Sequence, residues 1–109
     1  MKKIAVSPSI MCADLVNLEK SIREIEEIGV DSLHIDIIDS SFSPSMPLGI
    51  DTVKKIRSMT SMKFDVHIMS MNNELFIQEI INIGAESITF HYESSFHIDR
   101  LINLIKKSG

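Results

Sequence analysis

The stretch 33–39 reads Leu-His-Ile-Asp-Ile-Ile-Asp and predicts a buried β-strand, because it is short and rich in β-branched residues. Side chains alternate between the two faces of a strand, so His34 and Asp36 share one face while Leu33, Ile35 and Ile37 share the other. A histidine and a carboxylate on one face indicate a ligand pair or an acid–base pair. Buried polar groups that only satisfy each other would be the commoner explanation for such a pair alone.

A second stretch with the same character decides between these interpretations. Residues 64–69 read Phe-Asp-Val-His-Ile-Met, which predicts another strand with His67 between apolar residues. Two imidazoles and a carboxylate on neighbouring strands can converge on one cation. The sequence therefore predicts a divalent-metal site formed by His34, Asp36 and His67.

Outward from these two strands, the chain alternates between strand patterns and amphipathic helix patterns. Asp14 is the expected N-cap of the first helix and Gly29 its expected C-terminal residue, and a loop is expected from Ser40 to Gly49. Pro8 predicts irregular pairing within the first strand. The expected strands cover residues 4–11, 33–39, 64–69 and 87–93, and the expected helices cover 15–28, 51–59, 75–83 and 98–105. Such alternation predicts a parallel sheet with right-handed crossovers.

The alternation of side chains also sorts the two faces of this sheet. One face carries mainly apolar residues, where helices pack, and the other repeatedly carries polar residues. The polar face holds Ser7, Ser9, His34, Asp36, Asp65, His67, Thr89, His91 and Glu93. This pattern predicts an α/β fold, a parallel (β/α) barrel of the TIM type represented by four βα units, whose chemistry lies at the carboxyl ends of the strands. His91 is expected to be a hydrogen-bonded interior residue rather than a metal ligand.

Composition restricts the class of protein. With 109 residues, the chain is expected to form one domain over residues 1–109. Its formal net charge of −4, with lysines scattered among acids, does not indicate a nucleic-acid or membrane surface. The single cysteine allows no internal disulfide, and no apolar run is long enough for a signal or membrane segment. A cytoplasmic location is the resulting expectation.

Three motifs, in this order and spacing, resemble one known family. The first motif is Ser7-Pro8-Ser9-Ile10, followed by Ala13-Asp14-Leu15. The second is His34-Ile35-Asp36-Ile37, followed by Asp39, Phe42, Pro44 and Gly49. The third is Asp65-Val66-His67-Ile68-Met69, followed by Gly84-Ala85, Ile88-Thr89 and His91. Together they are similar to the N-terminal half of the ribulose-phosphate 3-epimerase family of ketose-phosphate epimerases. The pair Met11-Cys12 is closer to the allulose-6-phosphate relatives within that family.

The resemblance implies an activity and a set of residues for it. Members of the family abstract the C3 proton of a ketose phosphate, converting ribulose 5-phosphate to xylulose 5-phosphate through an enediolate. By resemblance, Asp36 is a catalytic acid–base and a metal ligand, His34 and His67 are metal ligands, and Ser9, His67 and Met69 contact the substrate. The implied cofactor is a divalent metal such as Zn, Fe, Mn or Co, among which the donor types do not discriminate.

Departures from the family pattern limit this expectation. The family's second catalytic Asp, its fourth metal ligand and its phosphate-binding loop belong to the second half of a barrel of about 200 residues or more. Ile38 stands where Met is usual, and Ser40-Ser41 replaces Gly-His. We therefore expect an N-terminal fragment that does not epimerise alone and that self-associates through open sheet edges. Alternatives are a non-catalytic metal- or sugar-phosphate-binding half-barrel, a structural remnant, and an allulose-6-phosphate 3-epimerase.

Overall fold

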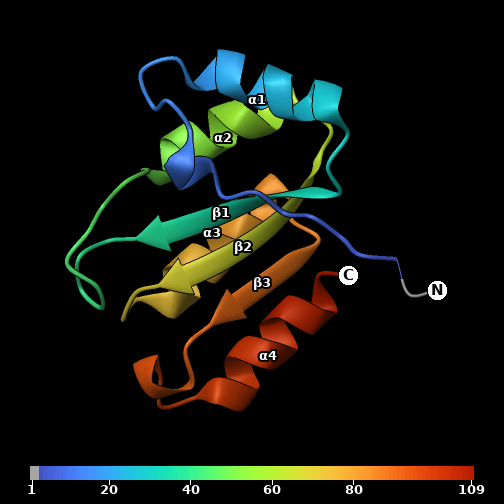
Figure 1. The fold of residues 1–109 in the computed structure, drawn as a ribbon. Coiled ribbons are helices and arrows are strands. Elements are labelled where there is room, and N and C mark those ends of the chain that lie inside the picture. Colours follow the sequence, from blue (N-terminus) through green and yellow to red (C-terminus); the bar gives the residue numbers. More distant parts are fainter. Residues whose placement is uncertain (1–2) are drawn as a thin grey trace.

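A parallel three-stranded sheet organises the molecule, for which a computed structural model describes residues 3–109. The strands are β1 (Ser32–Ile38), β2 (Lys63–Met69) and β3 (Ser87–Phe90), in the order β1-β2-β3. Their arrows point the same way in Figure 1. The register sets Asp36 of β1 opposite His67 of β2, and His67 opposite Thr89 of β3. The expected parallel sheet is thus confirmed.

Helices alternate with the strands along the chain, as the sequence predicted for an α/β protein. They are α1 (Leu18–Ile28), α2 (Ile50–Met59), α3 (Asn73–Ile83) and α4 (Ile98–Lys107), with short 3-10 helices η1 (Ile10–Cys12) and η2 (Tyr92–Ser94). Figure 1 shows α1 and α2 on the β1 side, α3 behind the sheet and α4 beside β3. Within residues 3–109, no helix combines the length and the apolar character that a membrane crossing requires.

The predicted strand over residues 4–11 is wrong. This segment runs beside β1, where the carbonyls of Val6 and Pro8 accept hydrogen bonds from the amides of Asp31 and His34, but only a single bridge from Ser9 to His34 forms. Pro8 has no N–H to donate, and the Val6 amide is bonded to the Asp31 carboxylate instead. Among the described residues the sheet therefore has three strands, not the four expected.

Two further boundaries differ from prediction by three residues. The last strand ends at Phe90 rather than near Glu93, because the chain turns into η2. Helix α1 begins at Leu18, since the Asp14 carboxylate accepts hydrogen bonds from the amides of Val16 and Asn17 and forms a turn ahead of the helix instead of capping it. Gly29 ends α1 as expected, with a φ of +79° that favours glycine.

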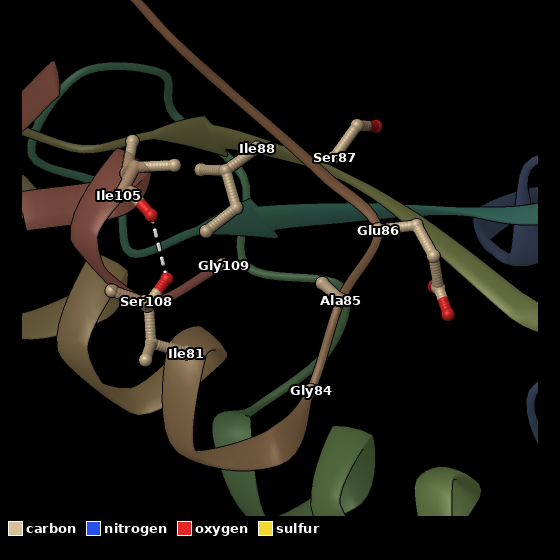
Figure 2. Close-up of a pocket in the computed structure, with 9 residues that line it drawn as sticks. All are labelled: Ile81, Gly84, Ala85, Glu86, Ser87, Ile88, Ile105, Ser108 and Gly109. Carbon is tan, nitrogen blue, oxygen red and sulfur yellow. Dashed lines mark hydrogen bonds between the residues drawn. The ribbon is translucent and has the colours of Figure 1, made fainter.

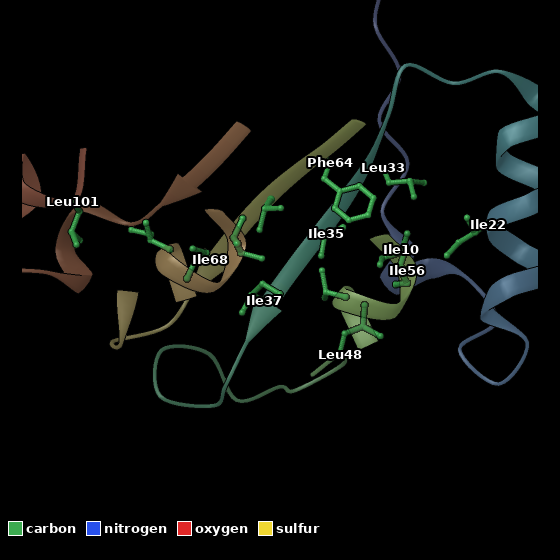
Figure 3. Packing of buried hydrophobic residues seen from close by; sticks show 14 residues of the cluster. Ile10, Ile22, Leu33, Ile35, Ile37, Leu48, Ile56, Phe64, Ile68 and Leu101 are labelled. Atoms are coloured by element: carbon green, nitrogen blue, oxygen red, sulfur yellow. The ribbon is translucent and has the colours of Figure 1, made fainter. Parts of the chain in front are cut away.

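One face of the sheet carries the hydrophobic core. Leu33, Ile35 and Ile37 of β1 are at most 2% exposed, and Phe64 and Val66 of β2 are fully buried. Figure 3 labels Leu33, Ile35, Ile37 and Phe64 among residues from the helices and loops. The core is completed by Ile10, Ile22, Leu48, Val53, Ile56, Ile68, Ile77, Ile80 and Leu101. The helices thus cover the apolar face, and the polar face of the sheet stays partly open.

Candidate metal centre

Three side chains on the open face of the sheet point at one another. His34 and Asp36 come from β1 and His67 from β2, and one ligand atom of each lies within 4.8 Å of the others. Asp36 Oδ1 lies 3.2 Å from His34 Nε2 and 3.4 Å from His67 Nδ1. Strand alternation places His34 and Asp36 on this face, and the β1–β2 register brings His67 opposite Asp36. The convergence expected from the sequence is present.

A second carboxylate, that of Asp65, contacts the other ring nitrogen of His34. His34 Nδ1 lies 2.8 Å from Asp65 Oδ2, and Asp65 in turn accepts a hydrogen bond from the Ser87 hydroxyl. Burial alone would lower the pKa of His34, but the hydrogen bond to Asp65 and the charges of Asp36 and Asp65 outweigh it and raise that pKa. The hydrogen bond from Ser87, joined by the one from His34, lowers the pKa of Asp65 although burial opposes this.

Asp36 is held by a residue from the segment that precedes η1. The Ser9 hydroxyl donates to Asp36 Oδ2 at 2.9 Å, and the bridge between Ser9 and His34 fixes the backbone there. Asp36 is only 8% exposed. Its Oδ1 lies 3.2 Å from His34 Nε2 and its Oδ2 accepts from Ser9, so both carboxylate oxygens have partners within the protein. Met69 lies two residues beyond His67 on the same face of β2 and is half-buried.

His67 is held by another histidine. Its Nε2 lies 2.7 Å from His91 Nε2, and His91 Nδ1 lies 3.3 Å from Glu93 Oε1. The ring of Phe42, from the loop after β1, packs on His91 with 4.6 Å between ring centroids. The hydrogen-bonded role expected for His91 is confirmed. Sequence reasoning gave no role to Asp65 or Glu93, although the alternation of side chains predicted that both lie on the polar face that carries the site.

The donor set fits a divalent transition metal. Two imidazole nitrogens and one carboxylate oxygen are ligands that such ions accept. Each histidine uses its other ring nitrogen in a hydrogen bond, His34 to Asp65 and His67 to His91, which is how metal-binding histidines are usually oriented. Binding of a metal ion at this site would displace any proton on His34 Nε2, because a nitrogen that ligates a metal must be deprotonated. His34, Asp36 and His67 could therefore hold a metal ion.

A separate hollow lies at the other end of β3, between the ends of α3 and α4, and has a volume of about 340 Å³ (Figure 2). It is lined by Ile81, Gly84, Ala85, Glu86, Ser87, Ile88, Ile105, Ser108 and Gly109. Its single carboxylate, Glu86, accepts a hydrogen bond from the Phe64 amide at 2.7 Å. None of the three candidate metal-site residues lines this hollow.

Comparison with known proteins identifies the family. The sequence profile of the ribulose-phosphate 3 epimerase family matches residues 5–109. The chain is 36% identical to ribulose-phosphate 3-epimerase of Bacillus subtilis over 97% of its own length and 49% of that relative. Identity is 38% to the enzyme of Chlamydia pneumoniae, over the whole chain and 49% of that relative. It is 37% to that of Methanocaldococcus jannaschii, over 97% of the chain and 44% of the relative. The chain spans about half the length of these curated relatives, and it belongs to the ribulose-phosphate 3-epimerase family.

Proposed function

We propose that this chain forms part of a metal-dependent ketose-phosphate 3-epimerase of the ribulose 5-phosphate to xylulose 5-phosphate type. The observation that carries the proposal is the meeting of His34, Asp36 and His67 on the open face of two parallel strands. In parallel βα folds, chemistry is found at the carboxyl ends of the strands; Asp36 and His67 lie in the second half of theirs, and His34 lies one residue before the middle of β1. The names of the relatives favour a pentulose substrate over allulose 6-phosphate.

His34, Asp36 and His67 would hold the metal, and the donor types suit Zn, Fe, Mn or Co. When bound, such an ion supplies positive charge that stabilises negative oxygens of the substrate and eases ionisation of the neighbouring C–H bond. The protein's own part is to keep the three ligands in place. Asp65, Ser9 and His91 do this, each bonded to one of the ligands.

Asp36 is the proposed base. Its carboxylate would take the proton from C3, and the electron pair of that C–H bond would pass into the C2–C3 double bond of an enediolate. Inversion requires that a second acid return a proton to the opposite face of C3. We propose that the chain, over residues 1–109, contributes the N-terminal half of a (β/α) barrel and that the second acid comes from the remaining half. Its relatives are about twice as long as this chain.

Ser9, His67 and Met69 are the proposed substrate contacts. Ser9 supports this role through its bond to Asp36, which keeps its hydroxyl beside the proposed base. Met69 is half-buried on the same strand face as His67 and would present an apolar thioether beside the planar enediolate. A ketose phosphate is therefore the small-molecule partner that we propose.

Proton exchange at C3 tests the proposal with the chain as it stands. Ribulose 5-phosphate is incubated in D₂O with the chain and Zn²⁺, Mn²⁺, Co²⁺ or Fe²⁺, and C3 deuteration is followed by NMR against a metal-only control. We expect exchange with the wild type and a loss of roughly 10²–10⁴-fold in the Asp36→Asn variant, because asparagine cannot take the proton. Asp99→Asn, an exposed position in the first turn of α4, is the matched control.

The outcomes separate the alternatives. Exchange that survives Asp36→Asn at more than a tenth of the wild-type rate would remove Asp36 from the mechanism. Metal binding without any C3 exchange would instead support a non-catalytic binding half-barrel. Epimerisation at about 10 s⁻¹, an ordinary enzymatic rate, by a monomeric 109-residue chain would contradict the proposal that a second half is needed.

A further inference from the structure

The two histidines of the candidate metal centre have hydrogen-bond partners of different kinds, a carboxylate for His34 and an imidazole for His67. His34 Nδ1 faces the Asp65 carboxylate, which can only accept a hydrogen bond when ionised. This contact selects the Nδ1–H form and leaves Nε2 facing Asp36. His67 is reversed, because its Nδ1 faces Asp36 and its Nε2 faces another imidazole at 2.7 Å. The partner of His67 could donate or accept, so the contact with His91 alone does not determine where the proton lies.

The next contact along this chain of side chains, taken together with a metal ion bound to His67 Nδ1, would fix the direction. Two neutral imidazoles whose Nε2 atoms are 2.7 Å apart share one proton between those atoms. If His91 carried it, His91 Nδ1 would be bare and would face the Glu93 carboxylate, a contact between two acceptors. If His67 carries it, His91 accepts at Nε2 and donates from Nδ1 to Glu93, and the bare Nδ1 of His67 faces Asp36 Oδ1 at 3.4 Å, where a bound metal ion would take its lone pair.

We propose that His91, backed by Glu93, is a positioning residue for His67. It accepts the Nε2 proton of His67 and thereby keeps the Nδ1 lone pair directed at the position shared with Asp36 and His34. Phe42 packs on the His91 ring and limits its rotation. This inference rests on the metal-binding part of the proposed function and extends it to residues from the end of β3 and from η2. Outer partners of metal-binding histidines usually change metal affinity by about 10–100-fold when they are removed.

Two variants of His91 separate positioning from mere packing. His91→Phe keeps an aromatic ring beside Phe42 but cannot accept a proton, whereas His91→Gln offers an amide oxygen that can. We expect the affinity for Zn²⁺ alone, measured by competition with a chelating dye, to fall about 10–100-fold in His91→Phe. In His91→Gln we expect affinity within a few-fold of wild type. His97→Phe, which removes an exposed histidine outside the cluster, is the matched control and should bind as wild type does.

A second readout does not involve the metal. Long-range ¹H–¹⁵N NMR spectra of the metal-free chain at a pH where His67 is neutral identify its tautomer. We expect a larger fraction of the Nε2–H form in the wild type than in His91→Phe, because the variant leaves only Nδ1–H with an acceptor, Asp36. Glu93→Gln changes an exposed side chain and should weaken zinc binding less than His91→Phe while moving the tautomer in the same direction. This exposed variant keeps the test available if His91→Phe does not fold.

Three results have distinct meanings. Wild-type zinc affinity in a folded His91→Phe variant would overturn the positioning role and leave the proposed function standing. A zinc-loaded wild type with His67 coordinated through Nε2 would also overturn it. Failure of the wild type to bind any of the four metals would instead contradict the proposed function, and the NMR measurement would still show whether His91 determines the His67 tautomer.

Discussion

The two faces of the sheet differ in what they contribute, although their residues alternate along the same strands. On β1, Ile35 is fully buried against the helices, while its neighbours His34 and Asp36 meet His67 on the open face. The helix side gains free energy from apolar burial, at roughly 25 cal/mol per Å². The open side places polar groups that need partners and contribute less net stability. Strand alternation thus separates the residues that stabilise the fold from those that would perform chemistry.

The largest test of this separation removes the metal ligands. We expect the His34→Ala/His67→Ala variant to lose the metal entirely while remaining folded, because both side chains lie on the open face outside the core. Elemental analysis after mild purification should give about one divalent metal per wild-type chain and none in the variant. Far-UV circular dichroism checks the fold. Equal metal content in the two proteins would contradict the assignment of the site.

The converse test replaces a core residue, Ile35, which lies between His34 and Asp36 in the sequence. Ile35→Ala should lower the free energy of unfolding by about 2–5 kcal/mol, because it opens a cavity in a fully buried position, and Ile35→Val by about 0.5–1.5 kcal/mol. Urea unfolding measures both values, and zinc titration of the folded variants should match wild type. A change in zinc affinity as large as that caused by a ligand substitution would mean that the two faces are not separable.

The edges of the sheet predict that the chain self-associates as its concentration rises. Among residues 3–109, β3 pairs with β2 alone. Apolar side chains are exposed near both edges of the sheet, including Val6 at 52%, Tyr92 at 79% and Phe96 at 99%. Unpaired strand edges and exposed apolar groups favour pairing with a second copy. We expect light scattering to detect homo-oligomers of the 109-residue chain, and Phe96→Lys to shift them toward monomer. Asn103→Lys, at an exposed α4 position, is the control, and a wild-type monomer at high concentration would contradict the expectation.

The same comparison explains how far sequence reasoning reached. Period-two alternation predicted both faces of β1 and β2 and the meeting of three candidate ligands, because parity depends only on the chain being extended. It failed at residues 4–11, where apolar alternation was outweighed by the missing N–H of Pro8 and by the bond from the Val6 amide to Asp31. Parity placed His91 on the right face. The direction of its contact with His67 depends on side-chain torsions that no periodicity encodes.

The smallest expected effect compares two aspartates at the end of β1. Asp36 faces imidazoles, whereas the carboxylate of Asp39 accepts hydrogen bonds from the hydroxyls of Ser41 at 2.6 Å and Ser70 at 2.7 Å. Burial alone would raise the pKa of Asp39, but the hydrogen bonds from Ser41 and Ser70 outweigh it, so that the pKa is lowered. Asp39 therefore ties the loop after β1 to the end of β2 most strongly when it is ionised.

The sign of the pH dependence follows from that shift. A carboxyl group whose pKa is lower in the folded chain contributes stability that is fully present above its unfolded pKa of about 3.9 and is lost as pH falls through the folded pKa. Asp39→Asn should therefore cost up to about 1 kcal/mol at pH 7, since solvent screens a partly exposed group. The difference between wild type and variant should shrink as the pH falls below about 4. Urea unfolding at pH 7, 5 and 3.5 measures it, and zinc affinity at pH 7 should be unchanged. A difference that stays constant with pH would show that the Asp39 charge contributes nothing and that only the shape of the side chain matters there.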